Sequence, residues 1–436
     1  MIKKKVLIIG GGTAGVTIAN RLQEHFDVTV IEKSKYKNYP IIYKIPTLIA
    51  LLFRSKKLKY INSRKFTLSN GRVIPYYESN TYGGSSVING CVHVLGSRKL
   101  WESILQKFNF NYDYLLESYN YIYSENHKTK HKIHLTSSYQ NIIDDSFIKV
   151  LNLLGIPVGN TNFADNESCG PILNTAKKFF RTSVLSIVSK KLFKLYLNEN
   201  VDELIFSDNG KVKGVKTNLR KIEADYVILS GGVIGSCNLL LREKNKNTKD
   251  TDRHLKDIEI GKDIQDHTNL RINVLTNKKI GSFNEISGSF YLKFLLLVKH
   301  LFGIPTLMRG TGATSAAYLD LDKDGEIDTR IQILQFFETG RHDSDTMFGN
   351  GRPGFSISIN AIHPESKGNI SLANDSLVIN PNYLSAKKDM EILKLALKYC
   401  VDLLKSNPIN DYVKEIIDED IITTEPEKYI KDTMYS

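Results

Sequence analysis

A short apolar strand that runs directly into a cluster of glycines is the feature of this sequence that most restricts its fold. Residues 6–9 read Val-Leu-Ile-Ile, which is typical of a strand buried on both faces of a parallel sheet. Gly10, Gly12 and Gly15 follow in a Gly-x-Gly-x-x-Gly arrangement, and residues 16–26 then place apolar side chains at helical spacing. The sequence therefore predicts a strand–turn–helix unit of an α/β fold.

Each glycine of this turn has a physical role. Gly10 permits the tight turn, Gly12 lets backbone N–H groups approach a pyrophosphate, and Gly15 lets the helix pack closely on the strand. Thr13 and Ala14 stand between the last two glycines, where the helix N-terminus supplies partial positive charge. The turn is thus suited to binding phosphate groups.

A carboxylate at the end of the next strand supports this interpretation. Residues 28–31 predict a second apolar strand, and Glu32 follows Gly10 by 22 positions. At that separation a carboxylate reaches the ribose hydroxyls of an adenine dinucleotide. A glycine match alone is usually only a turn, but strand, glycines, helix, strand and acid in this order favour a dinucleotide-binding site.

Length and charge restrict the number of domains and the class of partner. A chain of 436 residues exceeds the size at which one core stops growing, so two domains are expected. Its net charge of +12 is spread over short lysine clusters without aromatic interleaving or a nucleic-acid motif. This pattern favours a solvated lysine-rich surface; the alternative is association with nucleic acid or other anionic partners at low salt.

Cysteine usage and hydropathy indicate the compartment. The four cysteines show neither metal-binding spacing nor a disulfide framework, which favours a reducing environment. We find no signal-peptide pattern before the first strand, and the apolar runs 45–53 and 290–302 are too short or too interrupted by lysine to span a bilayer. We expect an intracellular protein that is not secreted and has no membrane partner.

A second glycine-rich stretch lies at residues 80–90, after a Lys- and Tyr-rich segment, 35–82, that we predict to be an irregular excursion. The stretch offers many backbone N–H groups and few large side chains, so it is suited to lying against a flat, phosphate-bearing ligand. Its residues of interest are Gly84, Ser85, Asn89 and Gly90.

Together with the N-terminal turn, the run from residue 80 to Trp101 resembles the first signature of the glucose–methanol–choline (GMC) family of FAD-dependent oxidoreductases. The similarity continues along nearly all of the chain, in the segments Arg181–Ser183, Leu195–Val201, Gly231–Leu240, Gly261–His267 and Gly368–Leu372. The resemblance implies FAD as cofactor. The contacts that it implies are Gly10, Gly12, Thr13, Ala14, Gly15, Glu32, Gly84, Ser85, Asn89, Gly90, Val92, Val201 and Gly231.

The resemblance also implies the architecture, an α/β (α+β overall) fold with two domains. A Rossmann-like FAD-binding domain would be assembled from residues 1–43, 71–101 and 195–267. A substrate or cap domain on an antiparallel sheet would take residues 102–181 and 271–412. Residues 413–436 would begin an incomplete C-terminal segment.

The implied reaction is oxidation of an alcohol CH–OH group: a histidine takes the hydroxyl proton while hydride passes to the flavin. Two departures bear on it. Arg242-Glu243-Lys244 replace the second half of the family's second signature, and the chain stops at Ser436, where the family's catalytic histidine segment would begin. We therefore expect a truncated FAD-binding member that is inactive as this chain.

The alternative is a catalytically degraded GMC-like protein with a structural or binding role. Frequent Lys, Asn, Ile and Tyr suggest an AT-rich genome, such as that of a large DNA virus, in which such a protein could be a particle component. The electron acceptor, the alcohol and the oligomeric state do not follow from the sequence.

Other candidate residues favour structural roles. His93 is the one weak catalytic candidate, although a packed or hydrogen-bonded histidine is the preferred interpretation. Asp266-His267 resembles an acid–base pair but matches a structural element of the family. Residues 320–326 resemble the start of a calcium loop, but Ile331 stands where the twelfth-position Glu is needed, so we predict a surface turn and no metal site.

Overall fold

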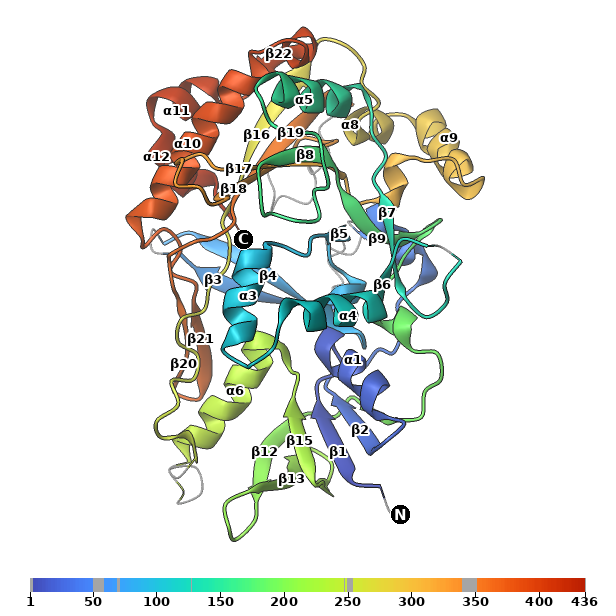
Figure 1. Cartoon of the computed structure of the whole chain (residues 1–436), viewed down its shortest axis with the longest axis vertical. Coiled ribbons are helices and arrows are strands. Elements are labelled where there is room, and N and C mark those ends of the chain that lie inside the picture. Colours follow the sequence, from blue (N-terminus) through green and yellow to red (C-terminus); the bar gives the residue numbers. More distant parts are fainter. Residues whose placement is uncertain are drawn as a thin grey trace.

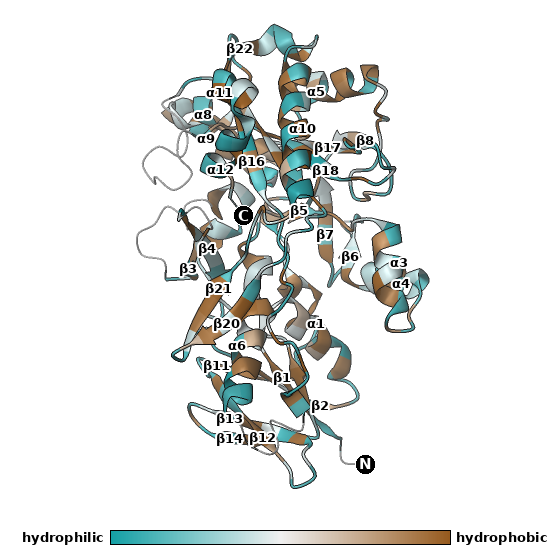
Figure 2. Cartoon of the chain, turned by 90° about the vertical axis from the view of Figure 1, so that its left-hand side faces the viewer, coloured by the Kyte–Doolittle hydropathy of each residue, from teal (hydrophilic) through white to brown (hydrophobic). Residues whose placement is uncertain are grey.

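The computed structural model describes residues 3–49, 59–68, 71–126, 128–246, 248, 254–338 and 351–435. At one end lies a parallel four-stranded sheet in the order β11-β2-β1-β15 (Figure 1). Its strands are β1 (Lys5–Ile9), β2 (Asp27–Glu32), β11 (Lys194–Leu197) and β15 (Tyr226–Leu229). Apolar residues concentrate on these strands (Figure 2). The predicted Rossmann-like unit is confirmed.

Helix α1 (Thr13–Leu22) connects β1 to β2, as predicted, but begins and ends earlier than the periodicity indicated. It begins directly after Gly12, because the glycine turn already orients the backbone for a helix. Residues 23–26 are not helical and form a turn. The side chain of Gln23 accepts a hydrogen bond from the Leu192 amide, which holds this turn in place.

A small antiparallel sheet and a helix complete this end of the molecule. The sheet has the order β12-β13-β14, with β12 (Val201–Phe206), β13 (Val212–Thr217) and β14 (Lys221–Glu223). Helix α6 (Gly232–Asn245) leaves the end of β15 and packs against β12 and the hairpin of β20 (Asn369–Ala373) and β21 (Ser376–Asn380).

The other end is built on a six-stranded antiparallel sheet in the order β22-β16-β19-β18-β17-β8. Its strands are β8 (Ser168–Pro171), β16 (Asn269–Thr276), β17 (Ala313–Leu319), β18 (Thr329–Leu334), β19 (Gly354–Ala361) and β22 (Val413–Ile416). Because side chains alternate along a strand, one face carries apolar residues that pack under α5 (Ile142–Leu153) and α10 (Lys387–Leu404). The predicted antiparallel sheet is thus observed.

Further helices and short strands lie between or after the strands of these sheets. They are η1 (Ile41–Lys44), η2 (Pro46–Ile49), η3 (Gly84–Val87), β5 (Val92–His93), α3 (Arg98–Gln106), α4 (Tyr112–Ile122), β6 (Tyr123–Ser124), β7 (Ile133–Ser137), β9 (Leu173–Lys177), β10 (Phe180–Arg181), η4 (Val184–Ile187), α8 (Phe283–Ser287), α9 (Phe290–Leu301), η5 (Leu307–Arg309), η6 (Ile409–Tyr412), α11 (Glu419–Thr424) and α12 (Pro426–Thr433). Strand β5 pairs with β9, so the chain after the second glycine-rich stretch is fixed to the middle of the molecule.

The prediction that residues 35–82 are irregular is wrong. The described part contains a hairpin of β3 (Ile61–Thr67) and β4 (Val73–Ser79), in register from Ile61 opposite Ser79 to Thr67 opposite Val73. The many lysines obscured a strand pattern, because only Ile61 and Phe66 are buried on β3 and the residues between them are part-buried or exposed. The tyrosines of this segment are themselves favourable in strands.

Among the described residues, we find no helix with the length and hydropathy needed to cross a bilayer. The apolar run 290–302 is almost entirely helix α9. Part of the other apolar run, 45–53, lies outside the described residues, as do His127 and His342.

Candidate cofactor site

The first glycine turn has a conformation that only glycine can adopt there. Gly10 has a φ of +104°, and a Cβ on it would lie 2.4 Å from the Ser230 carbonyl oxygen at the end of β15. A Cβ on Gly15 would lie 1.9 Å from the carbonyl oxygen of Gly10. Gly15 is buried in the helix–strand contact, so it sets the packing of α1.

The second glycine-rich stretch lies directly on the first. The Gly83 amide donates a hydrogen bond of 2.8 Å to the Gly11 carbonyl oxygen. Gly84 has a φ of +58°, and a Cβ on it would lie 2.8 Å from the Cα of Gly12. These two backbones can approach so closely because position 84 is glycine; a Cβ on Gly12 would still lie 3.9 Å from the Cα of Gly84.

The N-terminus of α1 is open to a ligand. Its N-cap, Gly12, has no side chain to satisfy the first helical N–H groups, and the first turn of the helix contains no acidic residue. Thr13 and Ala14 line the cavity in front of this terminus. Unpaired N–H groups and the helix dipole favour an anion at such a position.

Glu32 lies in the cavity wall with a nearly buried side chain, 7% exposed. One carboxylate oxygen accepts a 2.6 Å hydrogen bond from the Gly11 amide, and the other accepts a 2.7 Å bond from the Ser34 amide. Each carboxylate oxygen has a second lone pair. The residue therefore fixes the glycine turn and still has acceptor capacity for a ligand.

The cavity has a volume of 610 Å³, within the usual range for ligand pockets. A second helix N-terminus reaches it, since α6 begins there with Gly231 as an N-cap that makes no side-chain capping bond. The predicted residues that line the cavity are Gly10, Gly12, Thr13, Ala14, Glu32, Gly84, Ser85, Val201 and Gly231. One cavity thus brings together residues from five separate stretches of the sequence.

The remaining predicted residues do not line this cavity. Gly15 is buried in packing, whereas Asn89, Gly90 and Val92 continue the second glycine-rich stretch toward the antiparallel sheet. The Asn89 carbonyl oxygen accepts a 2.9 Å hydrogen bond from Arg181 Nη2, and the Gly90 carbonyl oxygen accepts a 2.6 Å bond from Thr311 Oγ1. The side chain of Asn89 and the backbone of Gly90 are exposed.

Several cavity residues were missed by sequence reasoning. They include Ser34, Arg64, Glu78, Ser230, Asn238 and Arg242. Arg64, which pairs with Glu78 at 2.6 Å, comes from the hairpin that was predicted to be irregular. Arg242 lies on α6, where the family signature is interrupted. This interruption was the sequence signal that could have identified Arg242 as a cavity residue.

The geometry of this site agrees with the comparisons to known proteins. A family model described as GMC oxidoreductase matches residues 4–269, more than half of the chain. The chain belongs to the GMC oxidoreductase family. Members of this family bind FAD.

Relatives are distant but similar over most of their length. An oxygen-dependent choline dehydrogenase of Vibrio vulnificus (strain YJ016) is 25% identical, over 99% of this chain and 82% of the relative. A glucose dehydrogenase [FAD, quinone] of Drosophila pseudoobscura pseudoobscura is 22% identical, over 93% of this chain and 71% of the relative.

Solved structures share the fold. A formate oxidase of Aspergillus oryzae RIB40 with the mutation R554K has a TM-score of 0.83 at 18% identity, covering 100% of this chain and 88% of that one. A fungal aryl-alcohol oxidase has a TM-score of 0.72 at 13% identity, covering 99% and 87%.

In this GMC chain, His93 is packed among aromatic side chains. Its Nε2 lies 3.1 Å from the Tyr119 hydroxyl oxygen, and the centroid of its ring lies 4.4 Å from that of Tyr123. Burial lowers the pKa of His93 to about 4. A base is most effective when its pKa lies near the working pH, so His93 is poorly suited to accept a substrate proton.

The Asp266–His267 pair is at the surface. His267 Nδ1 lies 3.7 Å from Asp266 Oδ1, and both side chains are substantially exposed. Asp266 accepts a 2.7 Å hydrogen bond from the Tyr383 hydroxyl. This contact joins the segment before β16 to the turn after β21 and agrees with a structural role.

The face of the large sheet turned away from α5 and α10 is polar. Tyr318 on β17 stands opposite Arg330 on β18, which stands opposite Asn360 on β19. Within the described residues, several buried atoms of this face have no hydrogen-bond partner: Tyr318 Oη, Arg330 Nε and Nη2, Gln332 Oε1 and Asn360 Nδ2. Such groups are costly unless a polar ligand or water satisfies them.

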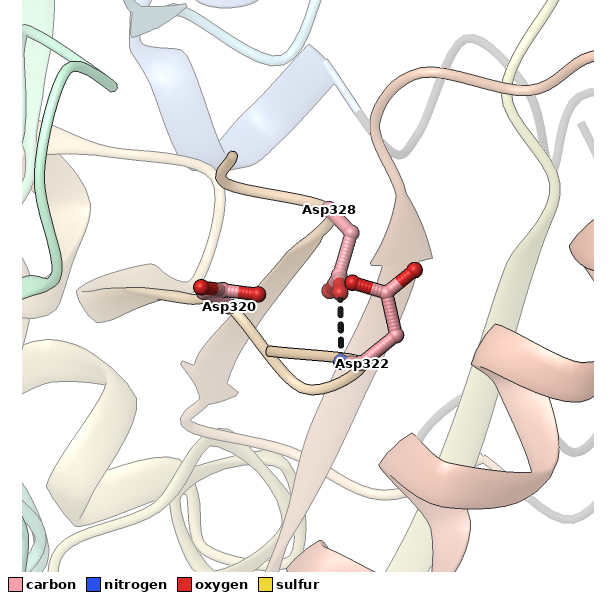
Figure 3. Close-up of side chains that lie close together, drawn as sticks. All are labelled: Asp320, Asp322 and Asp328. Carbon is pink, nitrogen blue, oxygen red and sulfur yellow. Dashed lines mark hydrogen bonds between the residues drawn. The ribbon is translucent and has the colours of Figure 1, made fainter. Parts of the chain in front are cut away.

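The turn between β17 and β18 brings three carboxylates together, as Figure 3 shows. Asp328 Oδ2 accepts hydrogen bonds from the Leu321 and Asp322 amides, and Asp320 Oδ2 accepts one from the Gly325 amide. Lys388 Nζ lies 3.2 Å from Asp322. Among the described residues, Asp320 Oδ1 and Asp328 Oδ1 are buried without a hydrogen-bond partner, and the three carboxylates lie within 4.8 Å of one another. Residues 320–326 form a bend between the two strands, as expected, whereas the absence of a metal site stays a prediction.

Proposed function

We propose that the chain binds FAD, with the adenosine diphosphate part of the cofactor in the 610 Å³ cavity. The observation that carries the proposal is the meeting of two helix N-termini without capping side chains, at α1 and α6, in one cavity whose wall contains Glu32. The helix ends fit a pyrophosphate and the carboxylate fits ribose hydroxyls.

The second glycine-rich stretch supports FAD in preference to NAD. Residues 84–90 leave the cavity beside Gly12 and run toward the antiparallel sheet, where Thr311 and Arg181 hold the backbone. A flavin continuing along this stretch would meet backbone groups and small side chains, including Ser85 and Asn89. Gly90 and Val92 would border the end of that path.

When bound, FAD supplies the hydride acceptor for oxidation of a CH–OH group. We propose an alcohol as substrate, on the side of the large antiparallel sheet. The unsatisfied groups of Tyr318, Arg330 and Asn360 would orient polar groups of that substrate and replace the water that it loses. The protein's own contribution is therefore positioning.

We expect no turnover of alcohols by this chain, even when it holds FAD. Of the histidines that the structure describes, none lines the cavity, and His93 combines a hydrogen bond to Tyr119 with a low pKa. Lack of a well-matched general base usually costs about 10²–10⁴ in rate.

Expression with excess riboflavin, followed by heat release and chromatography, tests cofactor binding. We expect FAD in the supernatant and no NAD. A protein that is folded by circular dichroism but yields a colourless supernatant would overturn the cofactor proposal.

Anaerobic bleaching of the flavin by primary, benzylic and sugar alcohols then tests the reaction separately. We expect no bleaching. Rapid bleaching that His93→Asn abolishes would make His93 the base, and rapid bleaching that survives His93→Asn would place the active site elsewhere. Either result would contradict the expectation that this chain is inactive.

A further inference from the structure

Helix α9 presents an apolar stripe to solvent. Its exposed face is formed by positions i, i+4, i+7 and i+11, which share one side of a helix. The stripe consists of Phe290 (86% exposed), Phe294 (59%), Leu297 (38%) and Leu301 (56%), and the following loop adds Phe302 (81%) and Ile304 (48%). So many adjoining exposed apolar side chains mark an interaction surface.

Buried contacts of His300, on one side of α9, fix this orientation. His300 is 1% exposed, and its Nε2 lies 3.1 Å from the Phe179 carbonyl oxygen. The ring of Phe179 packs edge-on against that of His300, and Thr306 Oγ1 lies 3.4 Å from His300 Nδ1. The helix therefore cannot turn its apolar stripe inward without breaking buried contacts.

Neighbouring segments extend the apolar surface. Element η2 contacts η5, which in turn contacts α9, and Thr47 Oγ1 donates a 2.8 Å hydrogen bond to the Gly310 carbonyl oxygen. Ile41 and Ile42 are exposed on η1, which packs on η2, and Phe180 is exposed beside Phe179. Figure 1 shows α9 at the edge of the molecule.

The charge of these segments has one sign. The sequence contains no Asp or Glu between Glu32 and Glu78, between Glu167 and Glu199, or between Glu285 and Asp320. These three intervals include η1 and η2, the turn at Phe179, and α9 with η5. The cations that these segments contribute near α9 in the sequence are Lys178, Lys293, Lys299 and Arg309.

We propose that α9 and its flanking cations dock the protein onto an anionic phospholipid membrane. An apolar helix face with lysines beside it can lie about 5–10 Å deep at the boundary between headgroups and acyl chains, while the lysines attract anionic headgroups. The helix is too short to span the bilayer, so docking is peripheral.

A second copy of the chain fits this surface less well. A two-fold interface would place the same patch of each copy against the other, and thereby bring lysines together without an acidic partner. Like charges across an interface are unfavourable. An anionic membrane supplies an apolar interior for the stripe and negative charge for the lysines.

Co-sedimentation of the full-length protein with vesicles tests the proposal. We expect binding to vesicles of phosphatidylcholine and phosphatidylserine, weak binding to phosphatidylcholine alone, and weakening as salt is raised. The double variant Phe290→Ser/Phe294→Ser should bind at least about tenfold more weakly, because burial of one Phe side chain contributes about that much. Lys293→Glu/Lys299→Glu should lose more than about fivefold.

Leu153→Ser/Leu154→Ser is the matched control, since these leucines are 69% and 54% exposed at the end of α5. It should bind vesicles as the unmodified protein does. The proposal is overturned if the unmodified protein ignores anionic vesicles, or if the control loses as much binding as the α9 variant. It is also overturned if light scattering shows a dimer that only the α9 variant abolishes, because the stripe would then be a subunit interface.

Discussion

Replacement of Glu32 by alanine gives the sharpest test of the cofactor site. The two carboxylate oxygens already accept hydrogen bonds from the Gly11 and Ser34 amides, and each oxygen has one further lone pair with which it can accept a bond from a ligand in the cavity. One hydrogen bond from a ribose hydroxyl to a carboxylate contributes about 1.5–3 kcal/mol. At about 1.4 kcal/mol per decade, Glu32→Ala should weaken FAD binding by roughly tenfold to a hundredfold.

The same change also frees two backbone amides, so the apoprotein should lose stability. Fluorescence titration of apoprotein with FAD gives the dissociation constant, and thermal unfolding of the apoprotein reports the second effect separately. Glu203→Ala is the control: Glu203 pairs with Lys216 and Lys246 but does not line the cavity. A dissociation constant that is unchanged in folded Glu32→Ala would refute the assignment of Glu32 to the ribose.

Three further predictions follow from individual residues. Gly84→Ala should lower FAD affinity by at least about tenfold, since its Cβ would meet the Cα of Gly12 at 2.8 Å, whereas Gly159→Ala, with 3.8 Å of clearance, should bind FAD normally in the same titration. Burial lowers the pKa of His93 from 6.5 in the unfolded chain to about 4 in the folded protein. The stability that depends on the neutral ring, about 3 kcal/mol, is therefore present above pH 6.5 and is lost as the pH falls toward 4. Denaturant unfolding between these pH values should therefore show a smaller loss of stability in His93→Asn, and an identical loss would contradict the burial of the neutral ring. Arg330→Ala should raise KM for any alcohol that bleaches the flavin without changing FAD affinity; a parallel loss of FAD would instead assign Arg330 to cofactor binding.

Local patterns predicted the nucleotide-binding half well. The strand, glycines, helix and Glu32 lie within 32 residues, and each has a steric reason that is independent of the rest of the chain. The cavity residues Arg64 and Arg242 could not be found in this way, because they reach the site from separate elements. Their presence depends on how β3, β4 and α6 pack, which no local pattern encodes.

Helix α9 shows a different limit. Its apolar residues were visible as a run too short to span a bilayer, but helical spacing cannot tell which face the protein covers. The contact of His300 with Phe179, which decides this, joins residues 121 positions apart. Exposure of the stripe is therefore a property of tertiary structure alone.

The order of strands has a consequence for synthesis of the protein on the ribosome. Strand β1, one of the first segments to emerge, is flanked by β2 and β15, and β15 begins only at Tyr226. In the large sheet, β8 pairs with β17, which begins at Ala313, so β8 cannot pair until that strand has been synthesised. Apolar strands near the N-terminus thus stay incompletely paired while much of the chain is made, so we expect nascent chains to fold late and to bind chaperones until residues of β17 have left the exit tunnel.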